Sequence, residues 1–147
     1  MNAGARGTPG AVNVAARQHE CLSLRLPVQA RSVGIGRRAA AQFAEEAGCS
    51  PETLWRVRLS VSEALSNVVL HAHATDEDAA ESVVELLAAY DGACCEVTIT
   101  DTGDGLQARE DSPGMGLGLA LIANSCDELA LDAGSAGGTV VRMRFNR

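Results

Sequence analysis

The sequence predicts a two-layer α/β sandwich, in which helices cover one face of a mixed, mostly antiparallel sheet. Its 147 residues suffice for one domain with a buried core, and 46% of them are hydrophobic. The strand-like segments follow one another in pairs, as in hairpins, and an Asp91-Gly92 turn separates two of them. Residues 20–147 are therefore expected to form one domain, and residues 1–19, which are rich in Gly, Ala and Asn, a flexible tail.

One strand and two helices are expected in the first half of the chain. The strand covers residues 21–26, which alternate moderately, and the first helix covers about 28–47, which is rich in Ala and Arg. Ser50 and Pro51 are typical of a helix N-cap and first turn, so a second helix is expected from Pro51 to about Ala72. Helical spacing of its apolar residues predicts a buried stripe of Leu54, Val57, Val61, Leu65 and Val68.

Two hairpins and one helix are expected in the second half. Residues 81–90 and 93–100 are β-rich runs that the Asp-Gly turn joins. A helix is expected at 117–125, directly after a series of glycines, and two further strands at 128–132 and 139–145. This order favours a sandwich over a doubly wound parallel sheet.

The charged residues exclude several classes of function. The net charge is -7, which argues against a general binder of nucleic-acid backbones. All 12 basic residues are Arg, and Lys is absent. A phosphate-binding P-loop needs a Lys on the phosphates, so this route to nucleotide binding is excluded.

The cysteines and the hydropathy favour a cytoplasmic protein. The five cysteines are an odd number without C-x-x-C spacing, which favours free thiols in a reducing compartment. A zinc site with His19, His71 or His73 would lack the usual ligand spacing. No run approaches the roughly 18 apolar residues of a membrane span, and the N-terminal residues lack the apolar core of a signal peptide.

Glu63 and Asn67 form the first candidate functional pair. Four residues apart on the second helix, they share one face, roughly opposite the apolar stripe. The amide oxygen of Asn67 could bind Mg²⁺, and the Glu63 carboxylate could deprotonate a nucleophile. Taken alone, the pair fits a solvated helix face better than a functional site, because an E-x-x-x-N spacing is common.

The segment Asp101 to Gly105 follows a predicted strand and is the second candidate. A carboxylate at a strand end can accept hydrogen bonds from an exocyclic amine, and Gly103 and Gly105 leave space for a flat ligand. The pattern does not match a calcium-binding EF-hand loop. Taken alone, it also fits an ordinary turn.

The third candidate is Gly114-Met115-Gly116-Leu117-Gly118, which opens a predicted helix. The free N–H groups at a helix N-terminus can bind phosphate. A dinucleotide-binding fold would place such glycines after its first strand, whereas these lie in the last third of the chain. A glycine-rich mobile loop is the alternative.

Taken together and in order, these segments resemble the motifs of the histidine-kinase-like ATPases, the GHKL or Bergerat fold. In that superfamily, a helix with Glu and Asn precedes a D-x-G-x-G box, a G-x-G box after a lid, and a late Gly-Thr. The corresponding residues here are Glu63 to Asn67, Asp101 to Gly105, Gly114 to Gly118, and Gly138-Thr139. The likeness covers about residues 20–146 and is greatest to the anti-sigma regulatory factors, whose helix motif E-A-x-x-N-x-x-x-H-A matches Glu63 to Ala72.

The resemblance implies a role for each matching residue. Glu63 would be the general base toward a serine hydroxyl, Asn67 would bind Mg²⁺, and Asp101 would bind the adenine amine of ATP. Further nucleotide contacts are implied at Gly103, Gly105, Gly114, Met115, Gly116, Leu117, Gly118 and Thr139. Arg109, in the implied lid, could touch a phosphate or be an ordinary solvated side chain.

The resemblance also implies partners. Anti-sigma regulatory factors bind a sigma factor and phosphorylate a serine of an anti-anti-sigma protein of the STAS type. The family contacts regulators through the early helix, here around Arg31 to Arg38, and a homodimer is implied. Two other functions remain open: a non-catalytic ATP-binding module for partner switching, and the catalytic domain of a sensor histidine kinase.

Overall fold

The computed structural model of the chain describes residues 20–71, 82–102, 115–135 and 137–147. The predicted tail at 1–19 lies outside these ranges. The described elements, in order, are β1 (Glu20–Pro27), α1 (Ala30–Glu46), α2 (Pro51–His71), β2 (Val83–Tyr90), β3 (Cys94–Asp101), α3 (Met115–Ser125), β4 (Glu128–Ala133) and β5 (Thr139–Asn146). Each corresponds to an element that the sequence predicts, with boundaries shifted by a few residues.

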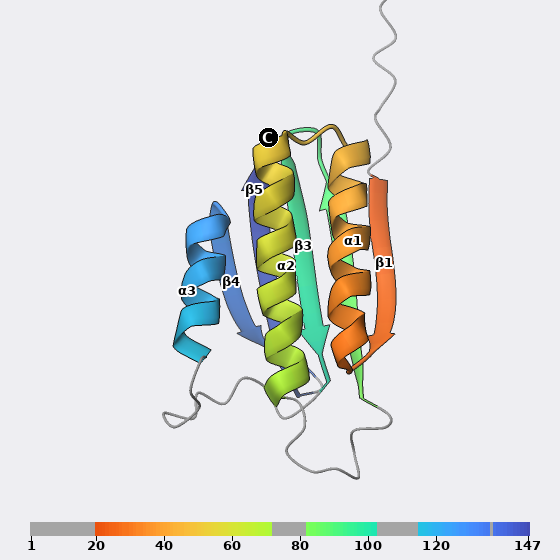
Figure 1. Cartoon of the computed structure of the whole chain (residues 1–147), viewed down its shortest axis with the longest axis vertical. Coiled ribbons are helices and arrows are strands. Elements are labelled where there is room, and N and C mark those ends of the chain that lie inside the picture. The colour runs from red at the N-terminus through yellow and green to blue at the C-terminus, as the bar shows by residue number, and fades with distance from the viewer. Residues whose placement is uncertain (1–19, 72–81, 103–114, 136) are drawn as a thin grey trace, which may run out of the picture.

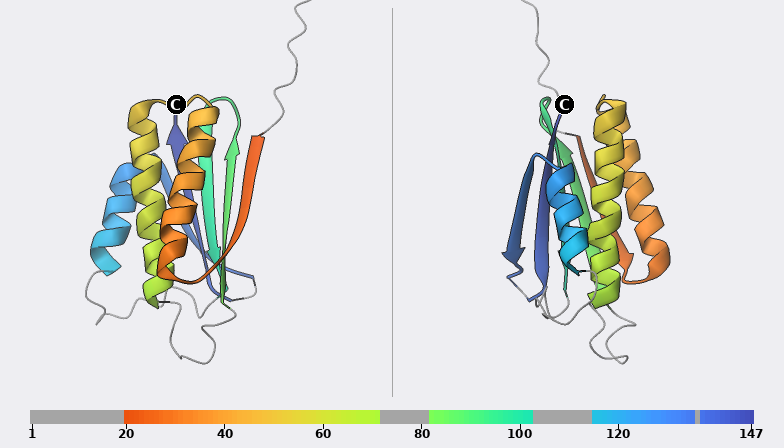
Figure 2. Two further views of the ribbon diagram at one scale, coloured as in Figure 1. Left: turned by 45° about the vertical axis from the view of Figure 1, so that its right-hand side comes forward. Right: turned by 60° about the vertical axis from the view of Figure 1, so that its left-hand side comes forward.

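The five strands form one sheet in the order β1-β2-β3-β5-β4. The sequence predicted a mixed, mostly antiparallel sheet. All four neighbouring pairs of strands are in fact antiparallel. The helices lie together on one face of the sheet, as Figures 1 and 2 show, which confirms the predicted two-layer sandwich. The close approach of β3 and β5, with Thr100 opposite Val140, brings together residues that are far apart in sequence.

The core lies between the helices and the sheet. The predicted stripe of α2 is buried throughout, with Val57, Val61 and Leu65 at most 1% exposed. Although aromatic residues are few, Phe145 and Phe43 are buried among the aliphatic side chains. Fully burying a side chain such as Leu65 stabilises the fold by about 1.5–3 kcal/mol.

Local hydrogen bonds explain two of the predicted boundaries. The Ser50 hydroxyl accepts a hydrogen bond of 3.2 Å from the Thr53 N–H, which confirms the predicted N-cap of α2. Between β2 and β3, one carboxylate oxygen of Asp91 accepts the N–H groups of Ala93 and Cys94 at 2.9 and 2.8 Å. Gly92 follows Asp91 with φ +97°, a conformation that favours glycine and closes the hairpin.

All five cysteines are free thiols, and only Cys21 is exposed. Burial raises the pKa of the Cys95 thiol to about 12, so this side chain is a protonated member of the core. Among the described residues, no group of three or more His, Cys, Asp or Glu side chains is arranged to hold a metal ion. Within the same ranges, the helices are too short or too polar to cross a membrane.

Candidate functional site

The structure brings Glu63 and Asn67 of α2 against α3. Asn67 is only 9% exposed, so the solvated helix face that the sequence left open is excluded at this position. A Cβ atom built on Gly118 would stand 3.3 Å from a carboxylate oxygen of Glu63 and 3.3 Å from the amide oxygen and nitrogen of Asn67. Glycine at position 118 therefore lets α3 approach the two polar side chains closely.

Small residues on α2 create this second buried face. Ser60 and Ala64 are 0% and 2% exposed and precede Asn67 at helical spacing. Side chains this small allow a neighbouring helix to come near. The apolar stripe of α2 thus faces the sheet and core, while its small-residue face, with Asn67, is also covered.

The second part of the candidate site lies where β3 ends and β5 begins. Asp101 and Thr139 are 7% and 6% exposed. Asp101 comes directly after Thr100 and Thr139 directly before Val140, so the antiparallel pairing of Thr100 with Val140 makes Asp101 and Thr139 neighbours. Both lie on the helix-covered side of the sheet, since burial alternates along each strand. Gly138 lies beside them with φ +80°, and a Cβ atom built there would meet the Asp101 backbone and its carboxylate.

Helix α3 begins earlier than expected. It starts at Met115 rather than Leu117, so Gly116 as well as Gly118 belongs to its first turn. Within this turn, Gly118 packs against α2. The first four N–H groups of any α-helix have no partner within the helix, and here they belong to the segment that begins at Met115. Leu117 is 74% exposed, so its side chain contributes little to the core.

These parts gather at one end of the molecule. In Figure 1, the C-terminal end of α2, the end of β3, the start of β5 and the start of α3 all lie at the end opposite the C-terminus. Three predicted site residues, Gly103, Gly105 and Gly114, lie outside the described residues, as does Arg109, and the described part of Met115 is its backbone alone.

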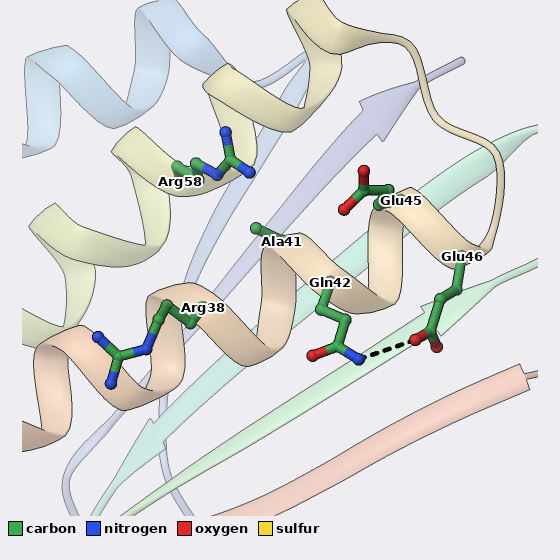
Figure 3. A pocket seen from close by; sticks show the side chains of 6 residues that line it. All are labelled: Arg38, Ala41, Gln42, Glu45, Glu46 and Arg58. Atoms are coloured by element: carbon green, nitrogen blue, oxygen red, sulfur yellow. Dashed lines mark hydrogen bonds between the residues drawn. The ribbon is translucent and has the colours of Figure 1, made fainter.

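Two hollows on the described surface lie elsewhere. A pocket of about 430 Å³ lies between α1 and α2 and is lined by side chains that include Arg38, Glu45 and Arg58 (Figure 3). A smaller one, of about 300 Å³, lies on the uncovered face of the sheet and is lined by a charged network around Arg142 and Arg144. Neither contains a residue of the candidate site.

Comparisons with known proteins identify the family. The sequence model of the histidine kinase-like ATPase domain family matches residues 26–145. The chain belongs to this family. The serine-protein kinase RsbW of Listeria monocytogenes serovar 1/2a is 34% identical over 131 residues, which cover 79% of this chain and 82% of that protein. The anti-sigma F factor of Heyndrickxia coagulans is 24% identical over 84% of this chain and 90% of its own length.

A solved structure shows the same fold. The RsbU and RsbW domains of a Mycobacterium tuberculosis protein superpose with a TM-score of 0.66 at 20% identity, over 86% of this chain. This chain spans 31% of that longer one. The predicted histidine-kinase-like fold and the likeness to anti-sigma serine kinases are confirmed by these matches.

The surroundings of two residues, one at this end of the fold and one at the opposite end, could not be recognised from the sequence. Gly138 was noted as part of a Gly-Thr motif, but its positive φ and its approach to Asp101 become visible only when β5 pairs with β3. Arg56, on α2, belongs to none of the motifs recognised in the sequence. It makes contacts with three segments distant in sequence, which are described below.

Proposed function

We propose that this protein binds Mg-ATP between α2, α3 and the β3–β5 end of the sheet, and transfers the γ-phosphoryl group to a serine of a partner protein. Relatives named serine-protein kinase and anti-sigma F factor, and the match to an ATPase domain over most of the chain, support ATP use and kinase activity. The observation that carries the proposal is the grouping of Glu63, Asn67 and Gly118.

The Glu63–Asn67–Gly118 group suits phosphate chemistry. Carboxylate and amide oxygens are the donors that Mg²⁺ takes, and Asn67 would hold the ion through its amide oxygen. The helix that begins at Met115 would direct unpaired N–H groups and its positive end toward the phosphates. Because Gly118 has no side chain, it leaves the space beside Glu63 and Asn67 unfilled.

The Asp101–Gly138–Thr139 group suits the base of the nucleotide. Asp101 would accept a hydrogen bond from the adenine amine, and buried Thr139 would support that contact. Gly103 and Gly105 would lie beside the base, and Gly114, Gly116 and Leu117 would contact phosphates through their backbone. Bound Mg-ATP would supply the phosphoryl group, while Glu63 would accept the proton of the attacking serine hydroxyl.

The partners that we propose are a sigma factor and an anti-anti-sigma protein of the STAS type. The names of the relatives support an anti-sigma role. Helix α1 exposes Arg31, Arg37 and Arg38, and none of them makes an ion pair within the described residues. Unpaired arginines on a helix face can bind carboxylates of a partner. We also propose that the protein forms a homodimer and acts in the cytoplasm.

The activity can be tested with γ-labelled ATP and a candidate anti-anti-sigma protein from the same organism. The wild type should label a serine of the partner, whereas Glu63→Ala should retain ATP binding and lose transfer by at least about a hundredfold. Glu52→Ala, an exposed acid at the other end of α2, is the matched control and should transfer at the wild-type rate.

The same assay separates the alternatives. ATP binding without transfer to any partner would identify a non-catalytic switching module. An acid-labile phosphohistidine, in place of an acid-stable phosphoserine, would identify a histidine kinase. Transfer by Glu63→Ala at the wild-type rate would refute the role of Glu63 as the base.

A further inference from the structure

Arg56 joins three segments at the end of the molecule remote from the nucleotide site. Its side chain is 20% exposed and lies over the Phe145 ring, with 5.9 Å between the guanidinium carbon and the ring centre. The Arg56 Nε–H donates to the backbone carbonyl of Ser125 at 2.7 Å, and a terminal nitrogen lies 2.9 Å from a carboxylate oxygen of Asp127. The same Asp127 oxygen accepts the Asn146 N–H at 2.7 Å.

These contacts hold the C-terminal end of α3. Ser125 is the last residue of that helix, and its carbonyl belongs to the negative end of the helix dipole. A guanidinium is well suited to this position because it can donate to a carbonyl and a carboxylate at once. Asp127 in turn accepts a hydrogen bond from Asn146 of β5. The contacts of Arg56 with Ser125 and Asp127, here called the Arg56 clamp, therefore connect α2, α3 and the sheet.

Helices α2 and α3 pack against each other along their length, and two specific contacts lie toward opposite ends of this interface. Arg56 contacts Ser125 at one, and Gly118 lies against Glu63 and Asn67 at the other. The two contacts are about two helical turns, or roughly 10 Å, apart along α3, and about two to three turns apart along α2. Apolar packing, including that of buried Ile122, holds α3 against the core between these contacts. The Arg56 contacts add a directional polar attachment at the C-terminal end of α3, which fixes the direction of the helix axis more closely than packing alone.

We propose that Arg56 is a positioning residue for the phosphates of the nucleotide, acting through α3. This inference rests on the proposed function, in which the first turn of α3 binds phosphate. Arg56 holds the far end of the helix and so directs the N–H groups that begin at Met115. The base-binding group, Asp101 and Thr139, belongs to β3 and β5 and does not depend on the direction of α3.

The positioning role predicts a loss of affinity for ATP but not for adenosine, whereas a general loss of stability would weaken the binding of both. In the full-length protein, Arg56→Met should weaken binding of Mg-ATP by about tenfold, a loss that corresponds to the smaller end of what a hydrogen bond to a charged group contributes. Binding of adenosine, which lacks phosphates, should change by less than about twofold, because the β3–β5 contacts are intact. Arg56→Lys, which can reach one acceptor but cannot donate to both in the same geometry, should give an intermediate loss for ATP.

Two controls isolate the effect. Arg58→Met removes an exposed arginine side chain two residues along the same helix. That side chain makes no hydrogen bond or ion pair within the described residues, so this variant should bind ATP like the wild type. Leu26→Ala removes a buried side chain of β1, so it lowers stability without touching α3. It should lose stability yet retain its ratio of ATP to adenosine affinity.

Isothermal titration of ATP and NMR titration of adenosine, with urea unfolding of each variant, provide the readouts. Equal weakening of ATP and adenosine in Arg56→Met, or unchanged ATP binding, would overturn the positioning role. If Arg56→Met does not fold, the ratio of ATP affinity to adenosine affinity in Arg56→Lys provides the test, and an unchanged ratio would overturn the positioning role. A wild-type protein that binds neither ligand would instead refute the proposed function, and this inference with it.

Discussion

Gly138 lies directly against Asp101, so closely that a Cβ atom at position 138 would stand 2.8 Å from the Asp101 carbonyl carbon and 2.9 Å from a carboxylate oxygen. Glycine also permits the φ of +80° at this position. Gly138 thus shapes the backbone and sets the position of the Asp101 carboxylate, which we propose binds the adenine amine.

Gly138→Ala should therefore weaken ATP binding as well as the fold. The left-handed backbone alone would cost about 1–2 kcal/mol with a side chain, and displacement of Asp101 would add to this cost. Gly92→Ala is the matched control, because Gly92 has φ +97° but nothing within 4 Å of a Cβ atom. Urea unfolding and ATP titration of both variants should show reduced affinity only for Gly138→Ala; equal affinities would contradict the assignment.

Gly118→Ala should separate catalysis from stability. The new methyl group would lie 3.3 Å from Glu63 and Asn67, a tight contact that those side chains must relieve by moving. Alanine would at the same time favour the helix by about 0.5–1 kcal/mol over glycine. We expect the melting temperature to change little and the rate of phosphoryl transfer to fall by about tenfold or more. An unchanged transfer rate would show that Gly118 does not set the geometry of Glu63.

Two glycines of α1 should respond oppositely to alanine. A Cβ atom on Gly36 would stand 2.5 Å from a Leu65 methyl group in the core, whereas on Gly34 it would have only the end of the Arg38 side chain nearby, at 3.5 Å. Gly36→Ala should destabilise the protein by about 1–3 kcal/mol through overpacking. Gly34→Ala should stabilise it by about 0.5–1 kcal/mol. Denaturant unfolding measures both; the same sign for the two would refute this account of their surroundings.

Asp127 should contribute to acid unfolding. The Asn146 N–H, and then Arg56, lower the pKa of the Asp127 carboxyl below its ordinary value of 3.8. Because this pKa is lower in the folded than in the unfolded protein, the carboxylate stabilises the fold fully at pH values above its ordinary pKa. This contribution is lost as the pH falls through the folded-state pKa. The difference in unfolding free energy between the wild type and Asp127→Asn should be constant above about pH 5 and shrink below about pH 4. A difference independent of pH down to pH 2 would contradict this mechanism.

Most element boundaries could be predicted because local chemistry determines them. Ser50 caps α2, and Asp91 and Gly92 close a hairpin through neighbouring N–H groups. The register that places Thr139 next to Asp101 depends on pairing between distant strands, so it could be inferred only through the resemblance. The burial of Asn67 depends on α3, and without that helix the residue looks like any polar position on a solvated face.

The clamp of Arg56 could not be predicted in this way. An arginine on a helix and an aspartate after another helix are both common on protein surfaces. Only the antiparallel packing of α2 and α3 brings Arg56 to Ser125 and Asp127. The sequence contains no local signal for such a contact.

The neighbouring positions of Asp101 and Thr139 have a consequence for how this fold can vary. The chain between them contains α3, which lies on the sheet, and β4, which forms the edge strand beside β5, before β5 itself pairs with β3. The start of α3 is attached to α2 through Gly118, independently of the strands. Residues could therefore be added or removed between Gly105 and Gly114, away from the glycines that we assign to the nucleotide, without shifting the register of β3 and β5, at an entropic cost that grows only slowly with length. Relatives of this chain can thus differ in the size of this connection and still keep the same two anchors, and the same connection is a permissive place to insert a reporter peptide.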